Sequence, residues 1–209
     1  MEVSTSQNPL EAFKRMREGV RQIILGWVVL GISLLVFLIA VVGAGYEGVN
    51  GGGILAGLIL MIVLMIVGGL ISLIGLYGKF IPGAGELARI DQRYSTGVSF
   101  MRIGLVWGLI LLILGAILTL LVIGILLVLA GYILLIIGYI GLVILSFNLY
   151  SLEGNSNFMI AGIFYIIGIL IPIFTIIAWL LLYAGLGDCV KKYSQAPPSP
   201  ASPLPLPPV

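Results

Sequence analysis

The sequence has no histidine, one cysteine and very few charges, and each shortage excludes a class of site. Without histidine and with a single thiol, the 209-residue chain lacks the ligands of a typical zinc site and cannot form an intrachain disulfide. Only 9% of the residues are charged, against about 25% in a typical soluble domain. The net charge of +2 gives no support for nucleic-acid binding. We therefore expect no metal, no cofactor and no nucleic-acid partner.

Apolar residues are abundant instead, and they occur in long uninterrupted runs. Hydrophobic residues make up 61% of the chain, which also contains 29 glycines. The ten basic and eight acidic residues fall into five places: residues 1–21, Glu47, residues 79–102, Glu153 and residues 188–192. A membrane-spanning helix needs about 20 apolar residues, and the runs between these charges are that long or longer. The sequence therefore predicts an all-α integral membrane protein.

The lengths of the uncharged runs predict a bundle of five spanning helices within residues 23–186. Residues 103–150 carry no charge and would measure about 72 Å as one helix, so we expect them to turn back near residues 122–124. The predicted spans are residues 23–43, 54–77, 103–121, 125–149 and 158–184.

The last predicted span contains Pro172, and two interpretations stay open. Residues 158–184 suit one tilted crossing that is kinked at Pro172, which gives five crossings. A split at Pro172 gives six. Residues 1–21 and 79–102 hold eight of the ten basic residues, so the positive-inside rule predicts a cytoplasmic N-terminus in the plasma membrane. Five crossings would leave Lys191 and Lys192 outside, against this rule.

Three segments outside the spans have their own signatures. Residues 1–22 predict a cytoplasmic amphipathic helix that starts at Asn8-Pro9, because Asn caps helices and Pro suits their first position. Residues 79–102 predict an interfacial loop with a short surface helix, in which Glu86 and Arg89 are spaced to pair. Residues 187–209 are rich in proline and predict a disordered tail that can bind a protein partner.

Glycines recur inside the predicted spans at intervals of four and seven residues. Small residues at these spacings form flat stripes along which helix backbones approach closely. We predict that the stripes pack helices within one molecule, and a homo-oligomer interface is the alternative. The candidate packing residues are Gly104, Gly108, Gly115, Gly124, Gly131 and Gly138.

The predicted spans contain no charged side chain, which argues against chemistry inside the membrane. A nucleophile there would have neither a histidine nor a buried carboxylate as its base. We therefore expect no catalytic, cofactor-binding or metal-binding residue, and no enzyme. A weakly polar path could be lined only by hydroxyl groups, and the candidates are Thr119, Tyr132, Tyr139, Tyr165 and Thr175.

Short motifs flank the apolar helices. Residues 8–14 read Asn-Pro-Leu-Glu-Ala-Phe-Lys and are followed by Arg17-Glu18-Gly19, while residues 182–188 read Leu-Tyr-Ala-Gly-Leu-Gly-Asp before the proline-rich tail. This pattern resembles a family of multi-pass membrane proteins from thermophilic archaea that is classed as a domain of unknown function. The resemblance covers most of the chain. It implies an archaeal plasma-membrane protein and transfers no functional residue.

Together these features predict a non-enzymatic membrane protein that acts as a scaffold or a small subunit of a membrane complex. Its partners would be membrane lipids and a protein bound through the tail. The alternative is a passive pore or facilitator for small neutral solutes. A lipid-handling membrane enzyme is a distant third.

Overall fold

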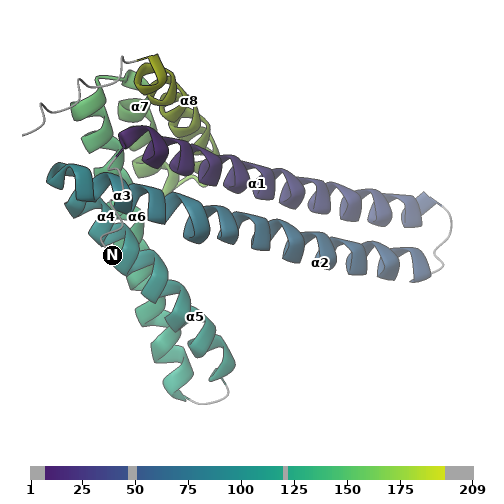
Figure 1. Ribbon diagram of the computed structural model, residues 1–209. Coiled ribbons are helices and arrows are strands. Elements are labelled where there is room, and N and C mark those ends of the chain that lie inside the picture. The colour runs from purple at the N-terminus through teal and green to yellow at the C-terminus, as the bar shows by residue number, and fades with distance from the viewer. Residues whose placement is uncertain (1–7, 47–50, 120–121, 196–209) are drawn as a thin grey trace, which may run out of the picture.

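The computed structural model describes residues 8–46, 51–119 and 122–195 of the chain (Figure 1). These residues form helices joined by short turns, and none of the three ranges contains a strand. Five of the helical stretches are long and apolar enough to cross a membrane. The prediction of an all-α, multi-pass membrane protein with five such helices is confirmed.

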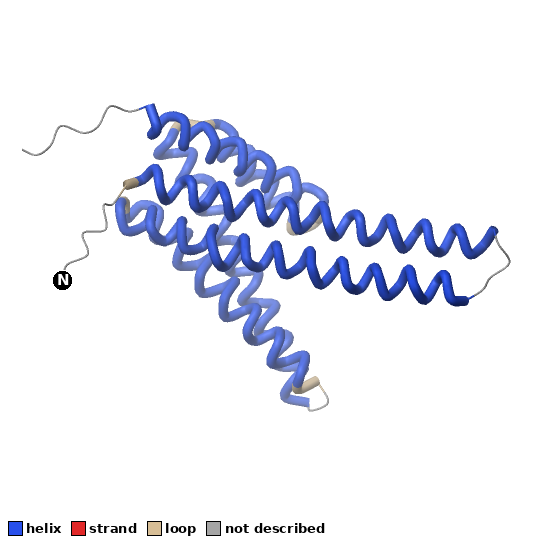
Figure 2. Tube along the Cα trace, turned by 45° about the vertical axis from the view of Figure 1, so that its right-hand side comes forward, coloured by secondary structure: helices blue, strands red, loops and turns tan. Residues whose placement is uncertain are grey.

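The first hairpin consists of two long helices that run side by side (Figures 1 and 2). Helix α1 spans Pro9–Tyr46 and helix α2 spans Gly51–Leu73. Asn8 caps α1 as predicted, because its side-chain oxygen accepts a hydrogen bond from the Leu10 N–H at 3.0 Å. The 38 residues of α1 form one helix of about 57 Å. The described part of the predicted surface helix at residues 1–22 is therefore continuous with the first span.

Helix α2 continues without a break into a second part of the molecule. It passes through the π-helical segment η1 (Ile74–Phe80) into α3 (Ile81–Ile90). Asp91 then ends this stretch in an extended conformation. Hydrogen bonds from the Arg93 guanidinium and backbone hold the pKa of the Asp91 carboxyl below its usual value.

The next continuous stretch leads into the second hairpin. It comprises the 3-10 turn η2 (Gln92–Tyr94), α4 (Ser95–Met101), the π-helical segment η3 (Arg102–Trp107) and α5 (Gly108–Ile117). Helix α6 (Val122–Glu153) returns alongside α5. The turn predicted at residues 122–124 instead falls between Ile117 and Val122, and residues 120 and 121 lie outside the described chain.

The segment at residues 79–102, predicted as an interfacial loop with a short surface helix, is helical over most of its length and partly buried. Leu87 and Tyr94 are only 2% and 3% exposed. Leu87 is covered because α3 packs on α1, and Tyr94 is covered because η2 packs against α3, α4 and α6. The predicted pairing of Glu86 with Arg89 is wrong, since Glu86 forms its ion pair with Arg15 of α1.

The chain breaks at Pro172, so a single kinked helix over residues 158–184 is wrong. Helix α7 spans Ser156–Gly168 and helix α8 spans Ile173–Gln195. Proline has no N–H to continue the helical ladder, and the N–H groups of Ile169 and Leu170 bond carbonyls three residues back, as in a tightened last turn. Of these two helices, only α8 is long and apolar enough to cross a membrane by itself.

Helix α8 folds back along α7 and ends where α7 begins. Asn155 caps α7, and its side-chain nitrogen donates to the Asp188 carboxylate near the end of α8 at 3.0 Å. The 13 residues of α7 measure about 20 Å, less than the roughly 30 Å of a membrane core. Helix α8 reaches Gln195, so residues 187–195 of the predicted tail are helical, and residues 196–209 lie outside the described chain.

The buried core lies at one end of the molecule, which we call the basic end. Helix α1 begins here, α6 and α8 end here, and α3 and α4 lie between them (Figure 1). The largest fully buried side chains of this core include Phe13, Phe80, Met101, Leu145 and Phe158.

All ten lysines and arginines lie in segments that meet at the basic end. Ion pairs connect these segments across the helices. Lys79 Nζ lies 3.0 Å from the Glu18 carboxylate, and Lys192 Nζ lies 3.0 Å from the Glu153 carboxylate. The start of α1, the helices from η1 to α4 and the end of α8 therefore share one side of the molecule.

From the basic end, the α1–α2 hairpin and the α5–α6 hairpin extend in different directions (Figures 1 and 2). Leucine, isoleucine and valine side chains along both hairpins are exposed; Ile39 is 63% exposed and Ile117 is 69% exposed. Such surfaces suit a lipid environment. Lipid tails are as apolar as these side chains, so burying the side chains inside the protein would gain no hydrophobic free energy.

Candidate functional site

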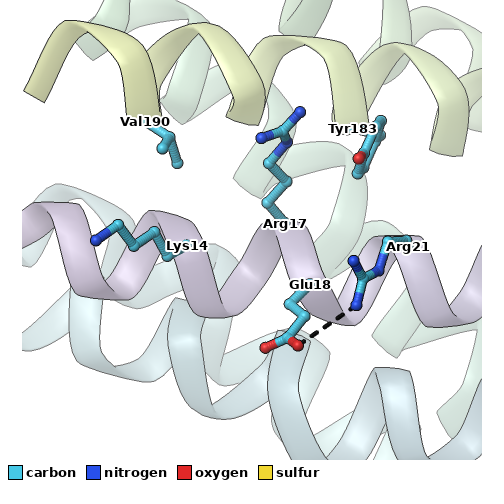
Figure 3. A pocket seen from close by; sticks show the side chains of 6 residues that line it. All are labelled: Lys14, Arg17, Glu18, Arg21, Tyr183 and Val190. Atoms are coloured by element: carbon cyan, nitrogen blue, oxygen red, sulfur yellow. Dashed lines mark ion pairs between the residues drawn. The ribbon is translucent and has the colours of Figure 1, made fainter. Parts of the chain in front are cut away.

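A basic pocket lies between α1 and α8 at the basic end (Figure 3). It has a volume of about 250 Å³. Three cationic side chains, one carboxylate, one aromatic ring and one aliphatic side chain line it: Lys14, Arg17, Arg21, Glu18, Tyr183 and Val190. Lys14, Arg17 and Arg21 share a face of α1 because they are three and four residues apart.

Arg17 extends from α1 toward α8, where its guanidinium lies over the ring of Tyr183 (Figure 3). The guanidinium carbon is 4.7 Å from the ring centroid, within the range of a cation–π contact. Gly187 makes room for it, since a methyl group there would lie 3.2 Å from a terminal nitrogen of Arg17. Among the described residues Arg17 has no acidic ion-pair partner, and its buried Nε lacks a hydrogen-bond partner.

The other charges of the pocket are compensated within the protein. Glu18 contacts Lys79 at 3.0 Å and Arg21 at 3.6 Å, while Lys14 contacts Glu11 at 3.2 Å. The contact of Arg17 with Tyr183 joins α1 to α8 across the pocket. Chemically, the pocket's cationic side chains can attract an anion.

The six glycines predicted as packing residues all lie along one contact, between the η3–α5 stretch and α6. A methyl group on Gly104 would overlap the backbone of Gly138. On Gly108 it would lie 2.9 Å from the backbone nitrogen of Leu135, and on Gly131 it would lie 2.9 Å from the carbonyl oxygen of Gly108. The two backbones are too close here for any side chain.

The remaining two predicted glycines lie closer to the turn of the same hairpin. A methyl group on Gly115 would lie 2.7 Å from the backbone nitrogen of Val128 and 2.9 Å from the carbonyl oxygen of Gly124. A methyl group on Gly124 would overlap the carbonyl of Leu118. All six positions thus face neighbouring backbone within the same chain.

A second set of glycines, which the sequence reasoning missed, brings α1 against α2 and η1. A methyl group on Gly68 would lie 2.9 Å from the carbonyl oxygen of Gly26, and one on Gly75 would lie 2.6 Å from that of Gly19. Gly19 and Gly26 are seven residues apart, as are Gly68 and Gly75. This is the spacing that marks the stripe on α6, so the signal was present in the sequence.

Only three of the five hydroxyl residues proposed to line a path come together. Tyr139 and Thr175 share a hydrogen bond of 2.8 Å, and the Tyr165 ring packs edge-on against Tyr139 with centroids 5.7 Å apart. Tyr132 is 59% exposed elsewhere on α6, and Thr119 donates to the Gly115 carbonyl at the turn. Within one chain, the structure therefore brings together Tyr139, Tyr165 and Thr175 but neither Thr119 nor Tyr132.

Potential ligands and nucleophiles are sparse in the part of the chain that the structure describes. No three acidic or cysteine side chains gather there in a metal-binding arrangement. Cys189 is buried in the basic end and is 2% exposed.

A comparison with known families finds a match over nearly the whole chain. A family model described as "Protein of unknown function (DUF973)" matches residues 9–209. No curated protein and no solved structure matches the chain.

Proposed function

The chain belongs to the DUF973 family of proteins of unknown function, and we propose that it acts as a non-enzymatic scaffold or small subunit of a membrane complex. Membership confirms the resemblance found in the sequence, whereas the archaeal origin stays a prediction. The observation that carries the proposal is the divergence of the α1–α2 and α5–α6 hairpins from a well-packed basic end (Figure 2).

The diverging hairpins expose apolar faces that this chain does not cover. Ile66 on α2 is 58% exposed and Ile113 on α5 is 53% exposed, although both lie well inside their helices. In a bilayer, helices associate through close packing rather than through removal of apolar surface from water. The two hairpins, which are joined only at the basic end, can therefore each pack against a helix of another subunit.

We further propose that the basic end faces the cytoplasm of the plasma membrane. The return of α8 places Lys191 and Lys192 at the same end as the other eight basic residues. The positive-inside rule then has no exception in this chain. Gln195, the last described residue before the proline-rich tail, lies at that end, so we expect a protein that binds the tail to be cytoplasmic.

Photo-crosslinking in native membranes tests the scaffold. With benzoylphenylalanine at Ile66 or Ile113, we expect an adduct with one membrane protein of reproducible mass, because these side chains lie on the uncovered hairpin faces. The same probe at Ile163 on the short α7, which is 43% exposed, is the control and should not give that adduct. Adducts with lipid alone at both hairpin positions would contradict the proposal.

A flux assay separates the scaffold from a passive pore. We expect liposomes that contain the purified protein to be as permeable to water, glycerol and small ions as empty liposomes. Channel-like flux would contradict the scaffold and support the pore. A bulky residue at Gly131 or Gly138 is not a useful pore blocker, because both glycines lie in the α5–α6 contact and the substitution would disturb the hairpin itself.

A further inference from the structure

A second cavity, which we call the arginine cleft, lies at the basic end where the two hairpins separate. It has a volume of about 420 Å³ and is bounded by η1 and α3 on one side and by α4 and η3 on the other. Its apolar wall includes Ile81, Val98 and Val106. Its charged lining residues are Glu86, Arg89 and Arg102.

Both π-helical segments of the described chain border this cleft. Tyr77 of η1 donates a hydrogen bond from its hydroxyl to the Leu105 carbonyl of η3 at 2.9 Å. This bond joins the two hairpins beside the apolar wall. A π turn leaves backbone groups outside the regular α-helical pattern, and such turns are frequent at functional sites.

The cleft contains two arginines whose charge is not compensated by the protein. Neither Arg89 nor Arg102 has an acidic side chain within ion-pair distance in the described ranges. Glu86, the only carboxylate that lines the cleft, forms its ion pair with Arg15. The basic pocket between α1 and α8 differs, because Lys14 and Arg21 there are paired with glutamates and Arg17 lies on Tyr183.

We propose that the arginine cleft binds an anionic phospholipid from the leaflet at the basic end. The phosphate lies between Arg89 and Arg102, and an acyl chain follows Ile81 and Val106 into the space between the hairpins. The uncompensated arginines and the order of residues along the two helical stretches support this assignment. Basic pockets between spanning helices attract anionic headgroups. Ile81 precedes Arg89 on the stretch that comes from the first hairpin, and Val106 follows Arg102 on the stretch that leads into the second. Both apolar side chains therefore lie nearer the hairpins than the arginine on their own stretch. A small soluble anion would contact the arginines and leave these apolar side chains unused.

Gly85 supplies a way to fill the cleft without touching its charges. It lines the cleft, and a methyl group built on it would meet nothing within 4 Å. Gly85→Leu therefore occupies the lipid's space while Arg89 and Arg102 are retained. Gly69→Leu in α2 is the matched control, because Gly69 also has nothing within 4 Å and does not line the cleft.

Native mass spectrometry of the full-length protein with phosphatidylglycerol, and with phosphatidylcholine of the same acyl chains, tests the proposal. We expect the wild type to retain phosphatidylglycerol preferentially. Arg89→Gln/Arg102→Gln is expected to weaken its binding about tenfold, and Gly85→Leu to reduce it with the arginines in place. Arg93→Gln/Lys191→Gln removes the same charge outside the cleft and should bind like the wild type.

Each other outcome overturns the lipid site. Equal binding of phosphatidylglycerol to the two double variants would mean that the arginines do not hold the headgroup. Unchanged binding to Gly85→Leu, in protein that elutes as the wild type does, would place the lipid elsewhere. If soluble glycerol phosphate bound as well as the lipid, the ligand would be a free phosphate and the acyl chain would play no part.

Discussion

Gly104→Ala is expected to lower the free energy of unfolding by about 2–3 kcal/mol, although alanine is the better helix former. The added methyl group would overlap the Gly138 backbone, and a backbone cannot move aside as a flexible side chain can. At about 2–4 °C per kcal/mol for a chain of this size, thermal unfolding in detergent should shift down by about 5–10 °C. Where a glycine has no atom near the added methyl group, the same substitution increases helix propensity and causes no steric overlap.

Gly69→Ala is that matched substitution. Gly69 lies within α2 and has nothing within 4 Å of a built methyl group, so alanine should leave the unfolding temperature unchanged or raise it slightly. A lower unfolding temperature for Gly104→Ala together with an unchanged or higher one for Gly69→Ala would support close α5–α6 packing. Equal unfolding temperatures would contradict it.

The same variant distinguishes packing within one molecule from packing between copies. If Gly104 and its stripe formed a homo-oligomer interface, Gly104→Ala would change the mass measured by light scattering at nearly constant unfolding temperature. We expect the reverse, a lower unfolding temperature at constant mass, because every close neighbour of Gly104 belongs to α6 of the same chain.

A thiol placed at residue 191 is expected to be protected from a membrane-impermeant maleimide in sealed right-side-out vesicles and to react after detergent opens them. Lys191 is exposed near the end of α8, which the break at Pro172 returns to the basic end. The variant is Lys191→Cys in a Cys189→Ala background. A reporter at the other end of the molecule, Gly53→Cys in the same background, should react in sealed vesicles because Gly53 is exposed at the start of α2.

In sealed vesicles, we expect nearly complete maleimide labelling of Gly53→Cys and almost none of Lys191→Cys. The native thiol cannot serve here, because Cys189 is buried and should react slowly from either side. Labelling of both reporters in sealed vesicles would mean that α8 ends on the side opposite to the proposed one. Labelling of Lys191→Cys alone would mean that the basic end faces outward, against the positive-inside rule.

The sequence by itself determined the class of protein, its long apolar helices and the glycines of the α5–α6 contact, but it left five and six crossings open. Long runs without charge exclude a soluble core, and Asn8 with Pro9 marks the start of α1 through local hydrogen bonding. The glycines at 104, 108, 115, 124, 131 and 138 are recognisable because a seven-residue spacing returns to one helix face. These signals are local, so they need no knowledge of the partner helix.

Only the tertiary structure decided where α8 ends, which arginines stay unpaired and how the hairpins diverge. The turn at residues 169–172 is as apolar as a membrane span, so composition cannot separate a kink at Pro172 from a reversal. Spacing suggested that Glu86 would pair with Arg89, but α1 brought Arg15 to Glu86 and left Arg89 in the cleft. A leucine that faces lipid and one that faces a protein partner have the same chemistry. The divergence of the hairpins therefore depends on packing at the basic end, which connects residues far apart in the chain.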